Sequence, residues 1–244
     1  ACLAMLAWSW GTWPDVLIDF GRELYVPWQL AEGKALYRDL AYLNGPLSPY
    51  VNSLWFRWFG VSLQTLVICN LVILTLLVML LYRLLSTLGD RLSATLACLT
   101  FVTLFAFRQE VGIGNYNFVC PYSHELTHGI TLSIAAIFSL AVYHRTRRLV
   151  AISTAGLILG CIFLTKAEVF LAAGLALGAG LGLTIWAERP ASCRVATLWG
   201  ALLSGAAVPP ILAFSLLCLA MPPEQALRGT LGSWPYAIQS NVLA

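Results

Sequence analysis

The chain has 244 residues, of which 59% are hydrophobic and only 10% are charged, and its formal net charge is +3. A mean hydropathy of +0.80 and this shortage of charge exclude a soluble globular protein, in which about 25% of residues are charged. The basic residues are scattered rather than gathered into a stripe, so we expect no nucleic-acid partner. The apolar residues instead form runs long enough for helices that cross a bilayer.

Taken in chain order, the apolar runs predict an all-α, polytopic transmembrane helical bundle. Residues 1–8 are the end of a first span, and a long outer loop with short amphipathic helices follows over 9–60. The later spans are predicted at 61–85, 92–107, 126–143, 149–164, 169–186 and 195–220, and an outer tail covers 221–244. Small residues over 172–182 predict a close helix–helix packing face. We expect a single transmembrane domain over 1–244, forming the N-terminal part of a longer chain.

Arginines in the short loops set the orientation of this bundle. Three arginine-bearing loops must share one side of the membrane, and the positive-inside rule assigns that side to the cytoplasm. Their arginines are Arg83 and Arg91, then Arg145, Arg147 and Arg148, then Arg189 and Arg194. Of the acidic residues, only Asp90 and Glu188 fall on that side. We therefore expect an integral protein of a bacterial cytoplasmic (inner) membrane, with its active site on the outer face.

The outer segment over 9–60 is too long for a simple connector and combines acidic, basic and aromatic residues. Asp19 is placed to begin a short helix that would bring Arg22 and Glu23 to the same side. Two carboxylates beside a guanidinium can hold a metal, activate a hydroxyl or bind a phosphate. The structural alternative is that Asp19 caps the helix and Glu23 is its helical partner. The aromatic residues form either an interfacial belt or a surface that stacks on sugar rings; they are Tyr25, Trp28, Trp55, Phe56, Trp58 and Phe59.

Part of this segment resembles the first outer loop of the GT-C class of integral-membrane glycosyltransferases. The residues that carry the resemblance are Asp19, Gly33, Tyr37, Arg38, Asp39, Gly45, Pro46, Leu47 and Tyr50. They are most similar to the protein O-mannosyltransferase and aminoarabinose-transferase-like branch, which has an essential acid where this chain has Asp19. The branch has Asp-Glu at this place, whereas this chain has Asp19-Phe20, so the second acid is Glu23 or another residue. The sequence therefore leaves both possibilities, with and without a divalent metal ion as cofactor. The sequence Thr165-Lys166-Ala167-Glu168 also resembles a turn between two later spans of these enzymes.

The resemblance implies transfer of a sugar from a polyprenyl-phosphate donor to a hydroxyl of a lipid, glycan or protein acceptor. The catalytic carboxylates would be Asp19 and Glu23, and the donor's tail would lie among membrane lipid between the spans. Cations would bind the leaving phosphate, with Lys166 the best placed and Arg22 and Arg108 as alternatives. For Lys166 the structural alternative is a snorkelling side chain paired with Glu168.

A second motif, His-Glu-Leu-Thr-His over 124–128, matches the H-E-x-x-H pattern of zinc proteases. On a helix His124 and His128 would face one way and bind zinc, Glu125 would be the base of a membrane metalloprotease, and Glu168 could be a third ligand. In a glycosyltransferase the same residues would line the sugar cavity beside Asn117 and Tyr122. The structural alternative is a pair of histidines that form hydrogen bonds at a helix end.

A third class of function is a transporter or flippase without chemistry. Acidic residues near the span ends and the glycine-rich span would serve such a protein. The long outer segment argues against it, because a simple carrier rarely needs one.

Overall fold

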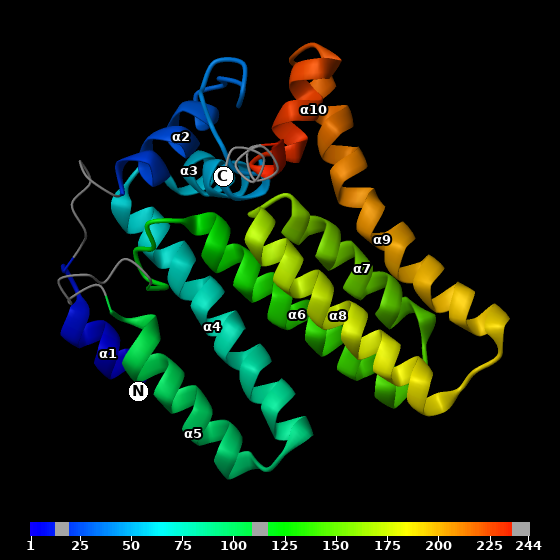
Figure 1. Ribbon diagram of the computed structural model, residues 1–244. Coiled ribbons are helices and arrows are strands. Elements are labelled where there is room, and N and C mark those ends of the chain that lie inside the picture. The colour runs from blue at the N-terminus through cyan, green and yellow to red at the C-terminus, as the bar shows by residue number, and fades with distance from the viewer. Residues whose placement is uncertain (13–19, 109–116, 236–244) are drawn as a thin grey trace, which may run out of the picture. The chain divides into compact units, whose positions relative to one another are not determined.

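A computed structural model describes residues 1–12, 20–108 and 117–235 (Figure 1). These residues form helices and turns, and their one strand-like pairing is an isolated bridge between Leu36 and Leu40. The predicted all-helical fold class is confirmed for this part of the chain.

Within the described residues, four helices are long and apolar enough to cross a membrane, and each coincides with a predicted span. They are α4 (Leu63–Leu88), α6 (His124–Thr146), α8 (Ala167–Glu188) and α9 (Ser192–Cys218). The chain is therefore a membrane protein.

The two other predicted spans, 92–107 and 149–164, are also helical but shorter. The first is α5 (Arg91–Phe101), continued by the π-helical turn η1 (Val102–Ala106), and the second is α7 (Leu149–Phe163). At 1.5 Å per residue the 15 residues of α7 rise about 22 Å, which is less than the roughly 30 Å of a hydrocarbon core. The remaining helices are α1 (Cys2–Ser9), α2 (Gly21–Ala31), α3 (Leu47–Phe59) and α10 (Pro223–Leu231).

The chain divides into two compact units with interleaved segments. The first unit comprises Ala1–Lys34 and Pro49–Thr127, and the second comprises Ala35–Ser48 and His128–Ala244. In the first unit α4 and α5 lie antiparallel (Figure 1), and Asp90 begins α5 by accepting a hydrogen bond from the Ser93 N–H at 2.9 Å. Aromatic side chains of this unit, among them Phe20, Phe56 and Phe107, are buried together in one core.

In the second unit α7 packs closely along α9. A Cβ atom at Gly156 would overlap the Leu202 carbonyl, and one at Gly160 would lie 2.7 Å from Cδ of Pro209. The run over 172–182 behaves differently: Gly180 faces Leu140, but a Cβ at Gly174 or Gly182 would meet no heavy atom within 4 Å. The predicted close-packing face is thus wrong for most of this run, and the close contact belongs to α7.

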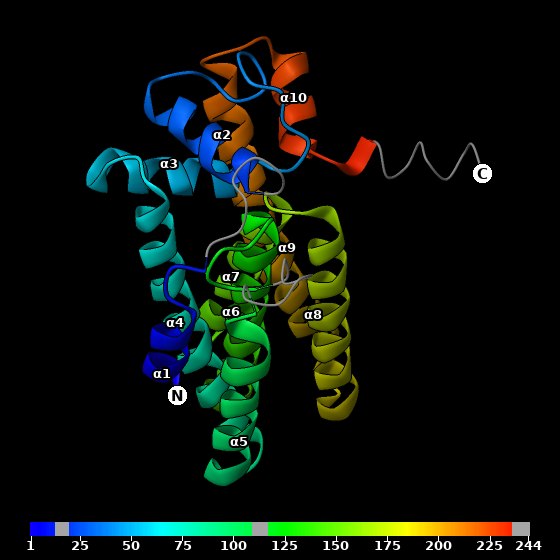
Figure 2. The same ribbon diagram turned by 90° about the vertical axis from the view of Figure 1, so that its left-hand side faces the viewer.

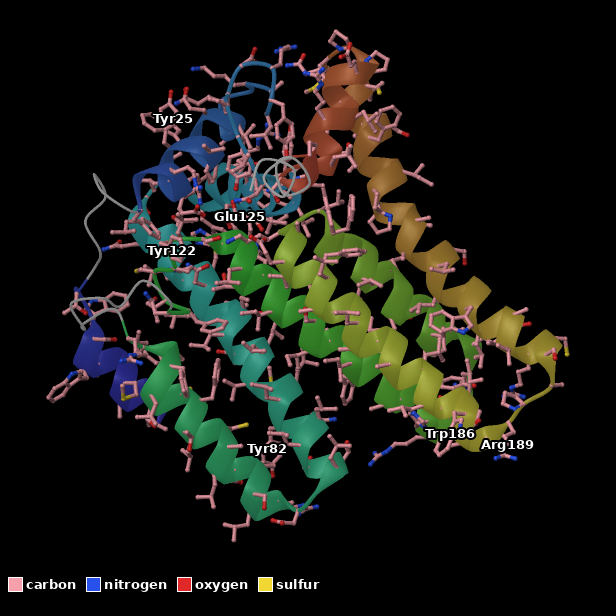
Figure 3. The ribbon with its side chains drawn as sticks, viewed as in Figure 1. Tyr25, Tyr82, Tyr122, Glu125, Trp186 and Arg189 are labelled. Atoms are coloured by element: carbon pink, nitrogen blue, oxygen red, sulfur yellow. The ribbon has the colours of Figure 1, made fainter. Side chains whose placement is uncertain are left out.

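One end of the second unit gathers the loop over 35–48, the α7–α8 turn and α10 (Figure 2). The Gly45 N–H donates to the Thr165 carbonyl at 2.9 Å, and the Leu47 N–H donates to the Leu164 carbonyl at 3.0 Å. The opposite end of α8 carries Trp186 and Arg189 (Figure 3). This end also holds an ion pair between Arg147 and Glu188.

Candidate functional site

In the first unit, the first turn of α2 meets the start of α6 through Glu23. Its side chain is only 4% exposed, and Oε2 lies 2.6 Å from Nδ1 of His124. The same oxygen accepts the backbone N–H of His124 at 3.1 Å. A carboxylate is favoured at this place because the N-terminus of a helix carries a partial positive charge. Glu23 thus caps α6 from a segment 101 residues away along the chain.

The imidazole of His124 is held on its other edge by Asn70 of α4. Nδ2 of Asn70 lies 3.1 Å from Nε2 of His124 and also donates to the Val119 carbonyl at 3.0 Å. An amide nitrogen only donates, so Nε2 must accept and Nδ1 must carry the proton that goes to Glu23. The ring of Phe20 packs against the imidazole at a centroid distance of 5.9 Å. His124 is therefore a buried imidazole in one fixed orientation.

Arg22 covers these buried groups on the solvent side. Its Nε and Nη2 donate to Oε1 of Glu23 at 3.1 and 2.7 Å, and Nη2 lies 3.9 Å from Oε2 of Glu125. The Arg22 side chain is 46% exposed. Burial acts to raise the pKa of Glu23, but the hydrogen bond from His124 and the charge of Arg22 outweigh it and lower the pKa. Glu23 is thus an ionised carboxylate with both oxygens engaged.

Glu125 is the second buried acid of this site. Its side chain is fully buried, and Oε2 accepts the Ser123 hydroxyl at 2.7 Å. Figure 3 shows Glu125 and Tyr122 near the start of α6. Tyr82, near the C-terminal end of α4, lies far from them in the same view. Arg22 is therefore flanked by two carboxylates and lies within the electrostatic influence of the Tyr122 phenol.

Asn117, predicted to bind substrate, shapes the turn that leads into α6. Its Oδ1 accepts the N–H groups of Val119 and Cys120 at 2.9 and 2.7 Å, and its Nδ2 donates to the Cys120 carbonyl at 3.1 Å. Burial raises the pKa of the Cys120 thiol to about 12, so that thiol stays protonated and unreactive. The turn is a scaffold for the start of α6.

The hydrogen bonds of His124, the first histidine of the H-E-x-x-H match, leave no lone pair for a zinc ion. Each ligand histidine must offer a lone pair, but Nε2 of His124 accepts from Asn70 and Nδ1 donates to Glu23. His128, in the second unit, has its Nδ1 3.0 Å from the Ser48 hydroxyl. Among the described residues no group of three or more His, Cys, Asp or Glu side chains is suited to hold a metal. We derive no step through a metal ion.

The other predicted site residues lie elsewhere in the chain. Asp19, the predicted catalytic acid, is outside the described residues. Arg108 is exposed, and the second unit holds a half-buried Lys166 and an exposed Glu168 at the α7–α8 turn. Within the part of the chain that the structure describes, Lys166 forms no ion pair with Glu168.

Sequence reasoning missed Asn70 and Ser48 as partners of the two histidines. Asn70 had a usable signal, since it is a lone amide inside the apolar run of α4 and such groups need a partner in a membrane. Ser48 had none, because a serine in the first turn of a helix, here α3, is ordinary.

The arrangement in the first unit can present a cation, backed by two buried carboxylates and an oriented imidazole, at the N-terminal end of a membrane-spanning helix. Such a site can receive an anionic group at the membrane boundary. Comparisons of the chain with protein-family models, with curated proteins and with solved structures found no match.

Proposed function

We propose that this chain is part of a membrane glycosyltransferase that moves a sugar from a polyprenyl-phosphate carrier to an acceptor hydroxyl on the outer face. The observation that carries the proposal is the half-exposed side chain of Arg22, whose guanidinium is held by buried Glu23 beside the first turn of α6. Because α6 is long enough to span the membrane, its first turn lies near a boundary of the hydrocarbon layer. The phosphate of a lipid-linked donor lies at the same depth when its tail is in the bilayer.

Arg22 is assigned to the leaving group. Attack of the acceptor oxygen on the anomeric carbon breaks the bond to the polyprenyl phosphate, and negative charge grows on that phosphate. A guanidinium already fixed in place stabilises this charge without reorganisation, and loss of one such donor costs about 10²–10³ in rate. Glu23 and His124 hold the guanidinium and the start of α6 in position.

Asp19 is assigned to the acceptor hydroxyl, which becomes a good nucleophile only when a base takes its proton. Glu23, the other predicted catalytic acid, is a poor base because both of its oxygens are engaged and its pKa is lowered. We therefore propose that Glu23 positions Arg22 and His124, and that Asp19 carries the proton transfer.

The test follows consumption of labelled polyprenyl-phosphate sugars by the protein in proteoliposomes. We expect wild type to consume at least one donor, and Arg22→Ala and Asp19→Asn to consume it about 100-fold more slowly. Arg22→Lys, which keeps the charge but loses the two-pronged geometry, should fall between them. Arg91→Ala, at an exposed arginine that begins α5, is the matched control and should behave as wild type. The proposal fails if no donor is consumed, or if Arg22→Ala is as fast as wild type.

A further inference from the structure

The second unit contains a cavity of about 490 Å³ between the loop over 35–48 and α10. This volume is within the roughly 300–1,000 Å³ of pockets that hold small molecules. Its lining includes Tyr37 and Tyr42 from the loop and Gln225, Arg228, Gly229 and Gly232 from α10 and its end. None of these residues belongs to the site around Arg22.

The loop wall of the cavity is fixed by the backbone and ring of Tyr37. Its φ of 67° is in the left-handed region, which a tyrosine adopts only when its surroundings hold it there. The Tyr37 hydroxyl donates to the Asn44 carbonyl at 2.7 Å, and Nε2 of Gln225 donates to the Tyr37 carbonyl at 2.6 Å. A Cβ at Gly229 would lie 2.7 Å from Cε2 of Tyr37, so the helix backbone comes directly against the ring. The ring is thus oriented before any ligand arrives.

The helix wall is fixed by Trp234, which follows α10. Its indole stacks on Phe163 of α7, with centroids 6.2 Å apart and an interplanar angle of 18°. It also meets Phe170 of α8 edge-on, at 5.9 Å and 81°. Both walls are therefore attached to the helices of the same unit, and the cavity is pre-formed.

The lining chemistry matches a sugar ring. Tyr37 and Tyr42 form an aromatic corner, with centroids 6.4 Å apart and planes inclined by 58°. The C–H face of a pyranose can pack on such rings, while its hydroxyls form hydrogen bonds with planar polar side chains such as Gln225 and Arg228. Arg228, which lines the cavity, also forms an exposed ion pair with Glu224 at 2.8 Å.

We propose that this cavity binds a pyranose ring, and that the ring belongs to a glycan acceptor. Sugar binding follows from the lining residues alone, whereas the acceptor role rests on the proposed function. The cavity would then define the acceptor class as a saccharide rather than a protein side chain.

The experiment uses the whole chain in lipid nanodiscs, since a sugar-headed detergent would compete for the site. Methyl glycosides of glucose, mannose, galactose and N-acetylglucosamine are titrated by ligand-observed saturation-transfer NMR. We expect at least one glycoside to bind, and Tyr42→Ala and Gln225→Ala to weaken that binding about tenfold. Tyr42→Phe keeps the ring and should retain most of the affinity. Tyr82→Ala, at an exposed tyrosine of α4, is the matched control and should bind as wild type.

The proposal is overturned if none of the glycosides binds. It is also overturned if Tyr42→Ala and Gln225→Ala, with thermal unfolding like that of wild type, both bind the glycoside as tightly as wild type does. Displacement of the bound glycoside by inorganic phosphate also overturns it, because the site would then be an anion site. The donor-consumption assay separates the two proposals: glycoside binding without donor consumption contradicts the transferase alone, and donor consumption without glycoside binding contradicts the cavity assignment alone.

Discussion

Glu23 is the residue on which the first unit's polar site depends, because its two oxygens link Arg22 on the surface to His124 in the interior. Replacing the carboxylate by an amide leaves one acceptor oxygen where two are used, so either Arg22 or the imidazole N–H and the start of α6 lose their acceptor. A buried polar group that loses its partner costs about 1–3 kcal/mol. This loss of stability comes from one side chain, so the pH dependence of the free energy of unfolding can measure it.

We predict that Glu23→Gln lowers the free energy of unfolding by about 1–3 kcal/mol at pH 7. The pKa of Glu23 is lowered from its ordinary 4.5 in the folded protein, so its stabilisation is present above the unfolded value and is lost as pH falls through the folded value. The gap between wild type and Glu23→Gln, measured by thermal unfolding in nanodiscs, should therefore narrow below about pH 4.5.

The control for this prediction is Glu32→Gln, at an exposed acid just after α2, which should stay within about 0.5 kcal/mol of wild type at pH 7. A gap for Glu23→Gln that is absent at pH 7, or that widens on acidification, would contradict the assigned role.

Asn70 is the second residue whose removal should be felt. We predict that Asn70→Leu destabilises the protein by about 1–3 kcal/mol, because Nε2 of His124 and the Val119 carbonyl both lose a buried donor. Chemical unfolding of the protein in mixed micelles measures the change. Thr75→Val on the same helix is the matched control, since the Thr75 hydroxyl is exposed and bonds only the Leu71 carbonyl of its own helix. Equal stability of the two variants would show that the Asn70 contact is dispensable.

At this scale the sequence predicted the neighbours but not the distant partners. The proximity of Arg22 to Glu23 follows from their adjacent positions in the sequence. The pairing of Glu23 with His124 spans 101 residues and depends on how α2 and α6 meet. The spacing of residues along the chain carries no information on this contact between α2 and α6. The two histidines therefore suggested zinc, whereas the structure shows His124 held by the carboxylate of Glu23 and the amide of Asn70.

Helix contacts in the second unit depend on where glycine leaves room for a neighbouring backbone. We predict that Gly156→Ala costs about 1–3 kcal/mol, because its Cβ would overlap the Leu202 carbonyl of α9 and the two helices must separate. Gly174→Ala on α8 is the matched control, where the new Cβ meets no heavy atom within 4 Å. That change should be neutral or stabilising by about 0.5–1 kcal/mol, because alanine favours a helix over glycine.

Thermal unfolding of the two alanine variants in nanodiscs gives the comparison directly. If Gly174→Ala were the more damaging substitution, the close contact would lie on α8 and not on α7. The spacing of the glycines on α8 explains why composition misled the prediction. Gly174, Gly178 and Gly182 recur every four residues and share one face of the helix, but a Cβ at Gly174 or Gly182 meets no heavy atom within 4 Å, and the close contact with Leu140 is made by Gly180 on another face.

For the whole molecule, the distribution of charge predicts the orientation in the membrane. The end of the second unit with Arg147, Glu188 and Arg189 should lie in the cytoplasm, and the end with α10 should lie outside. We predict that exposed Cys193 reacts with a membrane-impermeant maleimide only when the cytoplasmic face is accessible. A cysteine introduced by Glu224→Cys, in a variant with Cys193→Ser, should react from the outer face of intact cells. Reaction of both cysteines from one face would contradict the assigned topology.

Composition was sufficient to predict a helical membrane protein, because apolar runs of this length leave the backbone no other way to satisfy its hydrogen bonds. It could not predict that the loop over 35–48 belongs to a different compact unit from α2 just before it. That division arises from contacts such as those of Gly45 and Leu47 with the α7–α8 turn, which join segments more than 100 residues apart.

The contact between Tyr37 and Gly229 has a consequence for how this sequence can vary. Because the ring lies directly against the helix backbone, any side chain at 229 must displace it, and a smaller residue at 37 would make room for one. Positions 37 and 229 should therefore covary among natural relatives, with glycine at 229 wherever 37 is aromatic. The left-handed backbone at Tyr37 adds a second restriction, since β-branched residues are excluded there and asparagine and glycine are the substitutes it tolerates best.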